Sequence, residues 1–400
     1  MDPNQLLLET FAKGRQNQTN PYGFSFAQWQ ENARKVLPAD SWGYVFGSAG
    51  DSFTDGRDVE AFKKWLFVPR RLLPVSQCDI VPKYKVLGQN VPSPIAVAPV
   101  GVNTIFHRDG ERATAQAARD ANATFIMSSA TSMSIEEVAK ANGNGHRFFQ
   151  LYWPPNERND VTASILKRAK AAGFTALVVT LDTYVLGYRP SDLTNGYNPF
   201  FLPNQTGCGL GMSDPVFRET FKQKHGKEIE EDMDTAALEW TATLFCGKGH
   251  SWDDLKFLRE HWDGPIALKG IMSVEDAQLA VKHGVDGIVV SSHGGRQVND
   301  SVSSLEVLPE IVDAVGDKID VLFDSGVRSG TDVGTALALG AKMVLIGRPW
   351  VYGLSFGGKE GAQHVLRCLL ADLELSMRLA GCASVEKEHL NRSCLREAKW

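Results

Sequence analysis

The stretch Gly287-Ile288-Val289-Val290-Ser291-Ser292-His293-Gly294-Gly295-Arg296-Gln297 joins a short apolar run to a polar segment with two glycines. The apolar run is rich in β-branched residues, which predicts a buried strand. His293 can move a proton near neutral pH, and Arg296 can hold a carboxylate in two parallel hydrogen bonds. The glycines let the backbone approach a bulky group. Alone, the stretch fits either an active site for a small carboxylic acid or a polar surface loop, so its context must decide.

From residue 94 onwards, strand-like runs alternate with helix-like runs. Eight strand candidates occur, at 95–100, 124–127, 147–151, 176–181, 265–268, 287–290, 321–323 and 343–346. Helix candidates lie at 110–121, 134–141, 160–172, 251–261, 273–283, 305–315, 332–339 and 361–380. This alternation predicts an α/β fold, a (β/α)8 TIM barrel with its active site at the C-terminal ends of the strands. An open doubly wound sheet is the alternative, but residues 100–103 lack the glycine-rich turn that would support it.

The domain organisation follows from where this alternation begins and where it is interrupted. Residues 1–93 show helix-like spacing and predict an N-terminal helical segment that packs on the barrel. The barrel is expected over 94–390 and a C-terminal tail over 391–400. About seventy residues separate the fourth strand from the next helix, far more than an ordinary connection. We expect a lid insertion at 184–250 over the barrel mouth, since its aromatic content is high for the alternative, a disordered surface insertion.

The composition excludes several classes of protein. The 400 residues are 43% hydrophobic and 22% charged, and the net charge of −5 offers no basic surface for nucleic acid or an anionic membrane. No apolar run has the length of a membrane span, and neither a signal peptide nor a peroxisomal ending is recognisable. The six cysteines are scattered without a C-x-x-C pair, which predicts reduced thiols, no metal site and a cytoplasmic location.

Polar residues and glycines stand at the predicted C-terminal ends of all the strands. In strand order the residues at or just past these ends, polar or not, are Pro99, Val100 and Gly101; Ser128 and Ala130; Gln150 and Tyr152; Thr180 and Asp182; Lys269; Ser291, His293 and Arg296; Asp324, Ser325, Gly326 and Arg328; and Gly347 and Arg348. A barrel core needs none of these polar groups at that position. Their convergence therefore favours an active site over a solvated loop.

The last two strand ends predict a phosphate site. They combine glycines, arginines and a following helix N-terminus, whose N–H groups and dipole favour an anion. Lys269 could stabilise negative charge on a reduced flavin, and Ser128, Gln150 and Thr180 suit the edge of a heteroaromatic ring. The set points to a planar cofactor that carries a phosphate, most simply FMN. A phosphorylated sugar substrate, or pyridoxal phosphate with Lys269 as the Schiff base, fits the same residues.

The sequence resembles the family of FMN-dependent 2-hydroxy-acid oxidases and dehydrogenases over residues 26–390. The resemblance is carried by residues 291–297, Phe323-Asp324-Ser325-Gly326-Val327-Arg328-Ser329-Gly330-Thr331-Asp332-Val333, Gly347-Arg348-Pro349, Phe149-Gln150-Leu151-Tyr152 and Thr180-Leu181-Asp182-Thr183. Within the family the sequence is most similar to the lactate 2-monooxygenase branch. The resemblance implies FMN as cofactor, a small L-2-hydroxy acid as substrate, O2 as electron acceptor and assembly as a homotetramer.

The resemblance also implies a role for each site residue. His293 would be the base and Asp182 would stabilise its protonated form, while the proton could come from the α-carbon or from the hydroxyl. The substrate would be held by Tyr44, Tyr152, Arg189 and Arg296, with Ala130 beside it. The flavin ring and ribityl chain would be held by Pro99, Val100, Gly101, Ser128, Gln150, Thr180, Lys269 and Ser291. The ribityl and phosphate end would be held by Asp324, Ser325, Gly326, Arg328, Gly347 and Arg348.

Three residues depart from the common family pattern. Ser292 stands where most members have asparagine, and Ser325 stands where many have glycine, as in the monooxygenase-like branch. Ala130 replaces a bulky aromatic residue of glycolate oxidase, which opens the pocket to lactate or a larger acid. No haem-domain sequence precedes the barrel, which favours an oxygen-using enzyme. Four outcomes stay open: oxidative decarboxylation, release of a keto acid with peroxide, dehydrogenation of a larger acid, and a flavin-binding protein without activity.

Overall fold

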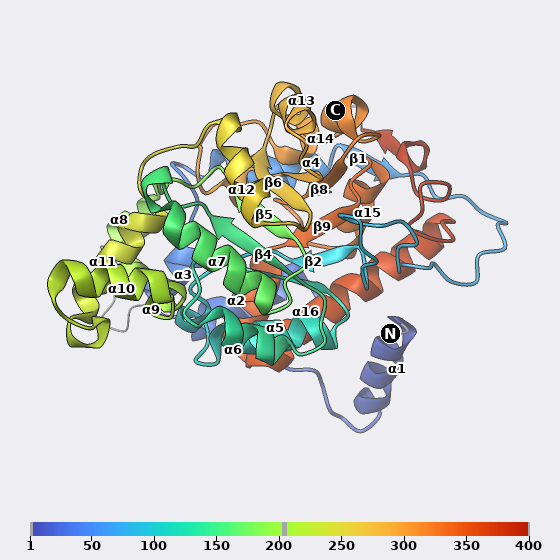
Figure 1. The fold of residues 1–400 in the computed structure, drawn as a ribbon. Helices are drawn as coiled ribbons and strands as arrows, with labels where there is room; N and C mark the ends of the chain where they lie inside the picture. Colours follow the sequence, from blue (N-terminus) through green and yellow to red (C-terminus); the bar gives the residue numbers. More distant parts are fainter. Residues whose placement is uncertain (1–2, 202–205, 399–400) are drawn as a thin grey trace.

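The computed structural model describes residues 3–201 and 206–398, and its centre is a closed barrel of eight parallel strands (Figure 1). The strands are β2 (Ile95–Val97), β3 (Thr124–Met127), β4 (Arg147–Tyr152), β5 (Leu177–Thr180), β6 (Ile266–Ile271), β7 (Gly287–Val290), β8 (Asp320–Phe323) and β9 (Met343–Ile346). Strand β9 pairs with β2 and closes the barrel. The predicted (β/α)8 fold is confirmed, and each of the eight strands overlaps the range predicted from the sequence.

Helices cover the outside of the barrel. They are α5 (Gly110–Asp120), α6 (Ile135–Asn142), α7 (Asn159–Ala171), α12 (Leu255–His261), α13 (Val274–Lys282), α14 (Ser304–Val315), α15 (Gly330–Ala338) and α16 (Arg348–Ala380). Serine caps begin several of them, as at Ser134, Ser303 and Ser329, where the side chain accepts a backbone N–H of the first turn. Helix α16 starts earlier than predicted. Gly358 (φ 55°, ψ −138°) breaks it internally, so the pattern of apolar residues that predicts the rest of the helix does not extend into the part before Gly358.

Side chains alternate across each strand, and this alternation fills the barrel. Val289 belongs to an inner cluster with residues such as Phe148 and Val178, whereas Ile288 and Val290 pack outward against the helices. The next inward positions toward the C-terminal ends are polar: Gln150, Thr180 and Lys269. Lys269 therefore lies within β6, not beyond it as expected from a strand ending at 268.

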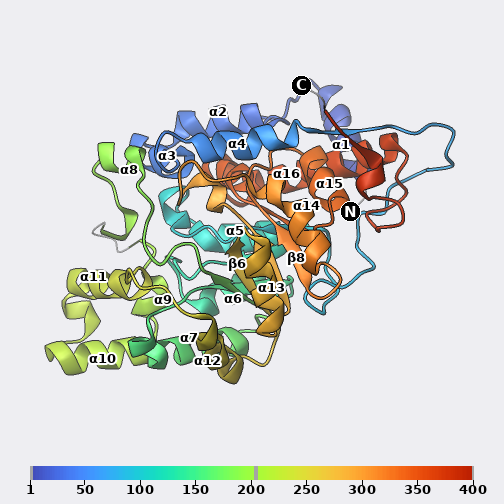
Figure 2. The same ribbon diagram turned by 90° about the horizontal axis from the view of Figure 1, so that it is seen from above.

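The N-terminal segment forms α1 (Pro3–Gly14), α2 (Phe26–Val36), α3 (Ala39–Phe46) and α4 (Phe53–Phe62). Figure 2 shows α2, α3 and α4 along one side of the molecule. Helix α4 packs against the short helix η6 (His293–Gly295), which carries the histidine motif. Strand β1 (Trp65–Phe67) pairs antiparallel with β10 (Leu395–Glu397), a sheet that the sequence did not predict. Among the described residues, no helix has the length and apolarity required to cross a membrane.

The long connection between β5 and β6 is helical over its described residues. It contains α8 (Pro190–Thr194), η3 (Pro199–Phe201), α9 (Gly209–Met212), α10 (Pro215–His225), η4 (Ile229–Glu231) and α11 (Met233–Leu244), which gather beside one end of the barrel in Figure 1. Phe217, Phe221 and Trp240 are buried and belong to the same hydrophobic core as the helices around the barrel. The alternative of a disordered insertion is therefore wrong for these residues. The remaining short helices are η1 (Asn103–Ile105), η2 (Asn156–Arg158), η5 (Trp252–Asp254) and η7 (Arg392–Cys394).

Candidate active site

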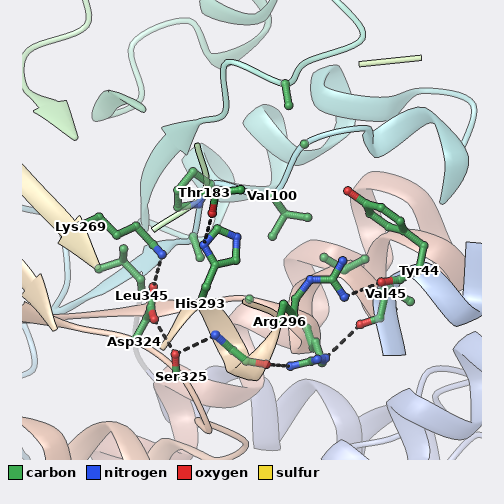
Figure 3. A pocket seen from close by; sticks show the side chains of 18 of the residues that line it. Tyr44, Val45, Val100, Thr183, Lys269, His293, Arg296, Asp324, Ser325 and Leu345 are labelled. Carbon is green, nitrogen blue, oxygen red and sulfur yellow. Dashed lines mark hydrogen bonds and ion pairs between the residues drawn. The ribbon is translucent and has the colours of Figure 1, made fainter. Parts of the chain in front are cut away.

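A cavity of ≈ 1020 Å³, measured to its open mouth, lies at the C-terminal ends of the strands (Figure 3). Most of the predicted site residues line it: Tyr44, Pro99, Val100, Gly101, Ala130, Tyr152, Arg189, Lys269, His293, Arg296, Asp324, Ser325, Gly326, Arg328, Gly347 and Arg348. Five do not line it and lie buried or partly buried nearby: Ser128, Gln150, Thr180, Asp182 and Ser291. In Figure 3, His293 lies between Lys269 and Asp324 on one side and Arg296 and Tyr44 on the other.

His293 and Asp182 form a hydrogen-bonded pair. The imidazole Nδ1 lies 2.8 Å from Oδ1 of Asp182, and the Thr183 hydroxyl lies 3.1 Å from the same nitrogen. Burial lowers the pKa of His293 although Asp182 opposes the shift. Burial alone would raise the pKa of Asp182, but His293 and Lys269 hold it well below its ordinary value. The pair therefore combines a neutral imidazole with an ionised carboxylate, as a general base requires.

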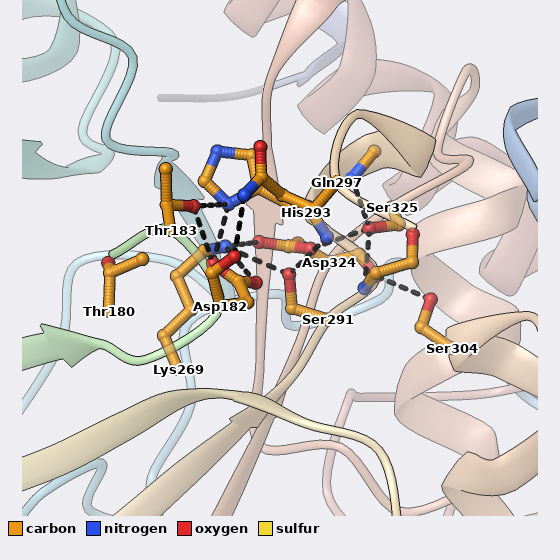
Figure 4. Close-up of polar contacts among 12 residues, drawn as sticks. Thr180, Asp182, Thr183, Lys269, Ser291, His293, Gln297, Ser304, Asp324 and Ser325 are labelled. Carbon is orange, nitrogen blue, oxygen red and sulfur yellow. Dashed lines mark hydrogen bonds and ion pairs between the residues drawn. The ribbon is translucent and has the colours of Figure 1, made fainter. Parts of the chain in front are cut away.

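Lys269 is a buried cation held from three sides (Figure 4). Its Nζ donates to Ser291 Oγ at 2.9 Å and lies 3.4 Å from Oδ2 of Asp324 and 4.0 Å from Oδ2 of Asp182. Burial opposes its charge, but the two carboxylates raise the pKa of Lys269 above its ordinary value. A lysine that stays protonated is a poor nucleophile, which disfavours the Schiff-base alternative.

Two guanidinium groups meet near His293 without a carboxylate within ion-pair distance among the described residues. Arg296 donates to the carbonyls of Tyr44 and Gly47 at 2.5 and 2.6 Å and lies 4.9 Å from the Tyr44 ring centroid. Arg189 donates to the carbonyl of Arg296 at 3.0 Å. Burial and the like charge of Arg189 lower the pKa of Arg296. A buried and a partly buried cation so close together create a site for an anion, and a carboxylate fits their fork geometry.

Gln297 ties the start of the insertion to the histidine motif. Its amide nitrogen donates to the carbonyls of Asp182 and Val185, and its Oε1 accepts from Arg189 at 2.7 Å. The sequence motif contained this residue, but its role could not be predicted, because its partners lie more than a hundred positions away. Gln297 thus fixes Asp182 and Arg189 relative to His293.

The glycines of the motif differ from expectation in one respect. Gly294 (φ 63°) lines the cavity, in keeping with a close approach to a bulky group. Gly295 (φ 69°) does not line it, and a Cβ there would lie 2.4 Å from the backbone nitrogen of Asp55 on α4. This second glycine is therefore required by helix packing rather than by a ligand.

The helices that begin near the predicted phosphate site, α15 and α16, differ at their N-termini. The N–H groups of Gly330 and Thr331, at the start of α15, donate to Asp372 at 2.7 and 3.3 Å, so the protein itself occupies that helix terminus. The start of α16 is different: within the part of the chain that the structure describes, no side chain caps it, and a Cβ built on Gly347 would meet no atom within 4 Å. Of the two helix starts, the start of α16 is therefore the one that suits an anion.

Two arginines stand beside the α16 terminus. Arg348 and Arg328 approach the same carboxylate oxygen of Asp55, at 3.0 and 3.5 Å. The pair keeps excess positive charge, and burial together with Arg348 lowers the pKa of Arg328. A phosphate would neutralise this charge. With Lys269 and the Pro99–Gly101 segment in the same cavity, the residues fit FMN.

The polar residues of β4 and β5 are hydrogen-bonded to one another. Gln150 accepts from the Ser129 N–H at 3.1 Å and donates to Thr180 Oγ1 at 3.0 Å, and Ser128 Oγ accepts from the Ala130 N–H. The barrel register places Thr180 opposite Lys269. These side chains form one polar layer with Lys269, which suits hydrogen bonds to the polar edge of a flavin ring.

Sequence reasoning missed the apolar wall of the cavity. Phe106 follows β2, whereas Leu186, Phe200 and Phe245 come from the insertion, and all four line the cavity with Ala130. Aromatic content within the insertion was the one available signal. A wall of this kind faces the side chain of a substrate rather than its carboxylate.

Comparisons with known proteins agree with this geometry. Residues 33–397 match the model of a family described as FMN-dependent dehydrogenase. The chain belongs to the FMN-dependent dehydrogenase family. It is 53% identical to an FMN-dependent alpha-hydroxy acid dehydrogenase of Schizosaccharomyces pombe, over 97% of this chain and 95% of the relative. An L-lactate oxidase of Lysinibacillus sphaericus is 37% identical over 92% of this chain and 91% of its own length.

A solved structure of mandelate oxidase with (S)-2-phenylpropionate superposes with a TM-score of 0.79 at 33% identity, covering 94% of this chain and 98% of that one. The predicted family, the FMN cofactor and the barrel are thereby confirmed. The protein is an FMN-dependent oxidoreductase for 2-hydroxy acids.

Proposed function

We propose that the protein oxidises an L-2-hydroxy acid and passes the electrons to O2. The observation that carries the proposal is that His293, paired with Asp182, faces two guanidinium groups, Arg189 and Arg296, in one cavity. A base beside a carboxylate site places the α-carbon of a 2-hydroxy acid within its reach. The named relatives include L-lactate oxidase, which supports both the substrate class and O2 as acceptor.

In the proposed mechanism, Arg296 and Arg189 neutralise and orient the substrate carboxylate, with Tyr44 beside them. His293 takes a proton at Nε2, because Nδ1 is engaged by Asp182, either from the α-carbon or from the hydroxyl. Asp182 stabilises the resulting imidazolium. FMN, when bound, supplies the two-electron acceptor, and Lys269 supplies a fixed positive charge for its reduced form.

The substrate is proposed to be lactate or a larger acid. Ala130 leaves space where a bulky side chain would close the cavity, and the four apolar residues of its wall suit an alkyl or aryl group. Structural relatives named mandelate oxidase, in complexes with phenyl compounds, support acids of this size. The Schizosaccharomyces pombe relative and a Penicillium citrinum relative that is 49% identical, both named dehydrogenases, support dehydrogenation of a larger acid as a further candidate.

For the oxygen step we propose the monooxygenase outcome, in which the peroxide oxidises the retained keto acid to the carboxylic acid one carbon shorter, with release of carbon dioxide and water. Its support is that Leu186, Phe200 and Phe245 of the insertion line the cavity, as a lid over it would. The oxidase outcome, with release of the 2-keto acid and hydrogen peroxide, is the second candidate, and the L-lactate oxidase relative favours it.

One experiment separates these outcomes. The purified protein is mixed anaerobically with a panel of L- and D-2-hydroxy acids while flavin bleaching is followed, and O2 is then admitted. Bleaching by L acids supports the proposed oxidation, and its absence across the panel contradicts it. Acetate and carbon dioxide from L-lactate indicate a monooxygenase, and pyruvate with peroxide indicates an oxidase. Reduced flavin that persists in O2 but is reoxidised by an artificial acceptor indicates a dehydrogenase.

Three further features remain predictions. A cytoplasmic location accords with six free cysteines. A homotetramer is expected from the family, and light scattering after size-exclusion chromatography would measure it. The division into residues 1–93, 94–390 with the insertion 184–250, and 391–400 is tested by limited proteolysis, which should cut near these limits first.

A further inference from the structure

Helix α4 of the N-terminal segment presses its backbone against two loops of the site. A Cβ built on Gly295 would lie 2.4 Å from the backbone nitrogen of Asp55, and one built on Gly326 would lie 2.3 Å from the carbonyl oxygen of Asp58. Contacts this short exclude any side chain at either glycine. Helix α4 is therefore in direct backbone contact with the loops that follow β7 and β8.

Asp58 is the polar side chain at the centre of this contact. It is fully buried; its Oδ2 accepts from Ser292 Oγ at 2.5 Å, and its Oδ1 accepts from the Ser304 N–H at 3.2 Å. No basic group lies within 4 Å of it among the described residues, and burial raises the pKa of Asp58 to about 6. Burying a carboxyl group without a neighbouring cation costs folding free energy, so packing alone does not explain an aspartate at this position.

The partner of Asp58 belongs to the histidine loop. Ser292 Oγ also accepts from the Gly295 N–H at 3.2 Å, while Ser325 Oγ accepts from the N–H groups of Ser292 and Gly294 at 3.3 and 3.0 Å. Between these points His293 adopts φ 58°, in the left-handed region that residues with a Cβ seldom occupy. This backbone conformation accompanies the 2.8 Å contact of Nδ1 with Asp182.

We infer that Asp58 is a positioning residue, which holds His293 in its left-handed conformation through the Ser292 hydroxyl and so keeps the imidazole on Asp182. The inference rests on the proposed function only for its kinetic test, because that test needs a 2-hydroxy acid that reduces the flavin. A purely structural role for Asp58 predicts lower stability without a specific effect on the step that uses His293.

The kinetic test compares Asp58→Ala, Asp58→Asn and Ser292→Ala in the FMN-loaded protein. Anaerobic flavin reduction is measured against substrate concentration, which gives a rate constant and a substrate Kd. Asp58→Ala should lower the rate constant roughly tenfold or more with Kd unchanged, and Asp58→Asn, which keeps one acceptor, should recover part of it. The double variant Asp58→Ala/Ser292→Ala should be no slower than the slower single variant, because both act through one hydrogen bond.

The control is Glu60→Gln on the same helix, since Glu60 is exposed and pairs with Lys63, the residue that follows α4. It should leave the rate constant unchanged. If Asp58→Ala reduces flavin at the rate of the unmodified protein, or if the two single effects multiply, the inference is wrong. If no 2-hydroxy acid reduces even the unmodified protein, the proposed function fails instead.

A crystal structure of the Asp58→Ala protein tests the inference without reference to activity. The expected result is that His293 leaves the left-handed region or that its Nδ1 moves out of hydrogen-bonding distance of Asp182. Should Asp58→Ala not fold, the same measurement on Ser292→Ala replaces it, because that change removes only a hydroxyl. An unaltered φ at His293 and an intact contact with Asp182 would overturn the inference.

Discussion

Nδ1 of His293 lies 2.8 Å from Oδ1 of Asp182, although 111 positions separate the two residues in the chain. They come from the ends of β7 and β5, which the closed barrel brings around the same cavity. The contact fixes which imidazole nitrogen can act, because the carboxylate engages Nδ1 and leaves Nε2 for the substrate. Together with Lys269, this contact lowers the pKa of Asp182.

The Asp182→Asn variant tests the electrostatic part of this contact. An amide keeps the size of the side chain but cannot stabilise an imidazolium, so the rate constant of flavin reduction should fall roughly 100-fold or more. FMN content should not change, since Asp182 does not line the cavity. His293→Gln serves as the reference for loss of the base: it should remain yellow and be reduced even more slowly. Reduction of Asp182→Asn at an unchanged rate would contradict the proposed role of the pair.

The pH dependence follows from the direction of the His293 shift. The base acts when unprotonated, and burial lowers its pKa, so the acid limb of kcat/KM should lie below the ordinary histidine value of about 6.5. Asp182 opposes this shift, so in Asp182→Asn the limb should move to still lower pH. Initial rates at low substrate concentration across the acidic pH range give the acid limb of the unmodified protein and that of Asp182→Asn. An acid limb above pH ~7 in the unmodified protein would contradict the assignment.

Ala130 should set the size of the accepted side chain. Replacing it with phenylalanine places a ring in the cavity that Phe106 and Phe245 also line. The expected result is a loss of kcat/KM of roughly tenfold or more for aryl or long-chain acids, with a much smaller change for L-lactate. The ratio of the two kcat/KM values is the decisive quantity, because general damage to the site would lower both. An equal loss of kcat/KM for both substrates would show that Ala130 does not determine substrate specificity.

Arg348 should act through the phosphate of FMN. Arg348→Ala removes one charge from the pair that shares Asp55 and should weaken FMN binding roughly 10- to 100-fold. Riboflavin lacks the phosphate and provides the control, since its affinity should change little. Both dissociation constants can be measured by fluorescence titration of the apoprotein. Equal losses of affinity for FMN and riboflavin would indicate that Arg348 supports the structure of the site and does not bind the phosphate.

The barrel could be predicted because each strand carries its own signal. Runs such as 287–290 are short, apolar and β-branched, and polar residues mark their ends. Residues that stand at strand ends were predicted for the same reason, since closure of the barrel brings those ends together. The sheet of β1 and β10 was not predictable, because its strands have three residues each and lie at opposite ends of the chain.

The parts of the site that escaped prediction depend on tertiary contacts without a local pattern. Asp55 and Asp58 lie on an N-terminal helix whose sequence gives no sign that it touches the histidine loop. The occupation of the α15 terminus by Asp372 depends on how α16 packs across it. Phe200 and Phe245 reach the cavity through the path of the insertion, which has no regular period to indicate its course.

Asp214 should be essential to the stability of the insertion. It is fully buried, caps α10 through the N–H groups of Val216 and Phe217, and accepts from Arg168 of α7 at 3.1 Å. Asp214→Ala removes the cap and leaves Arg168 without its buried partner, so the free energy of unfolding should fall by about 2–4 kcal/mol in urea.

The control for Asp214 is Glu228→Ala, which breaks an exposed ion pair with Lys222 in the same insertion and should have little effect. If the insertion retains the keto acid and peroxide, loosening it should also increase the share of peroxide released per turnover. Asp214→Ala should therefore lower stability and raise peroxide release together, whereas Glu228→Ala should change neither. Lower stability with an unchanged share of released peroxide would show that the insertion does not determine whether the keto acid and peroxide are retained.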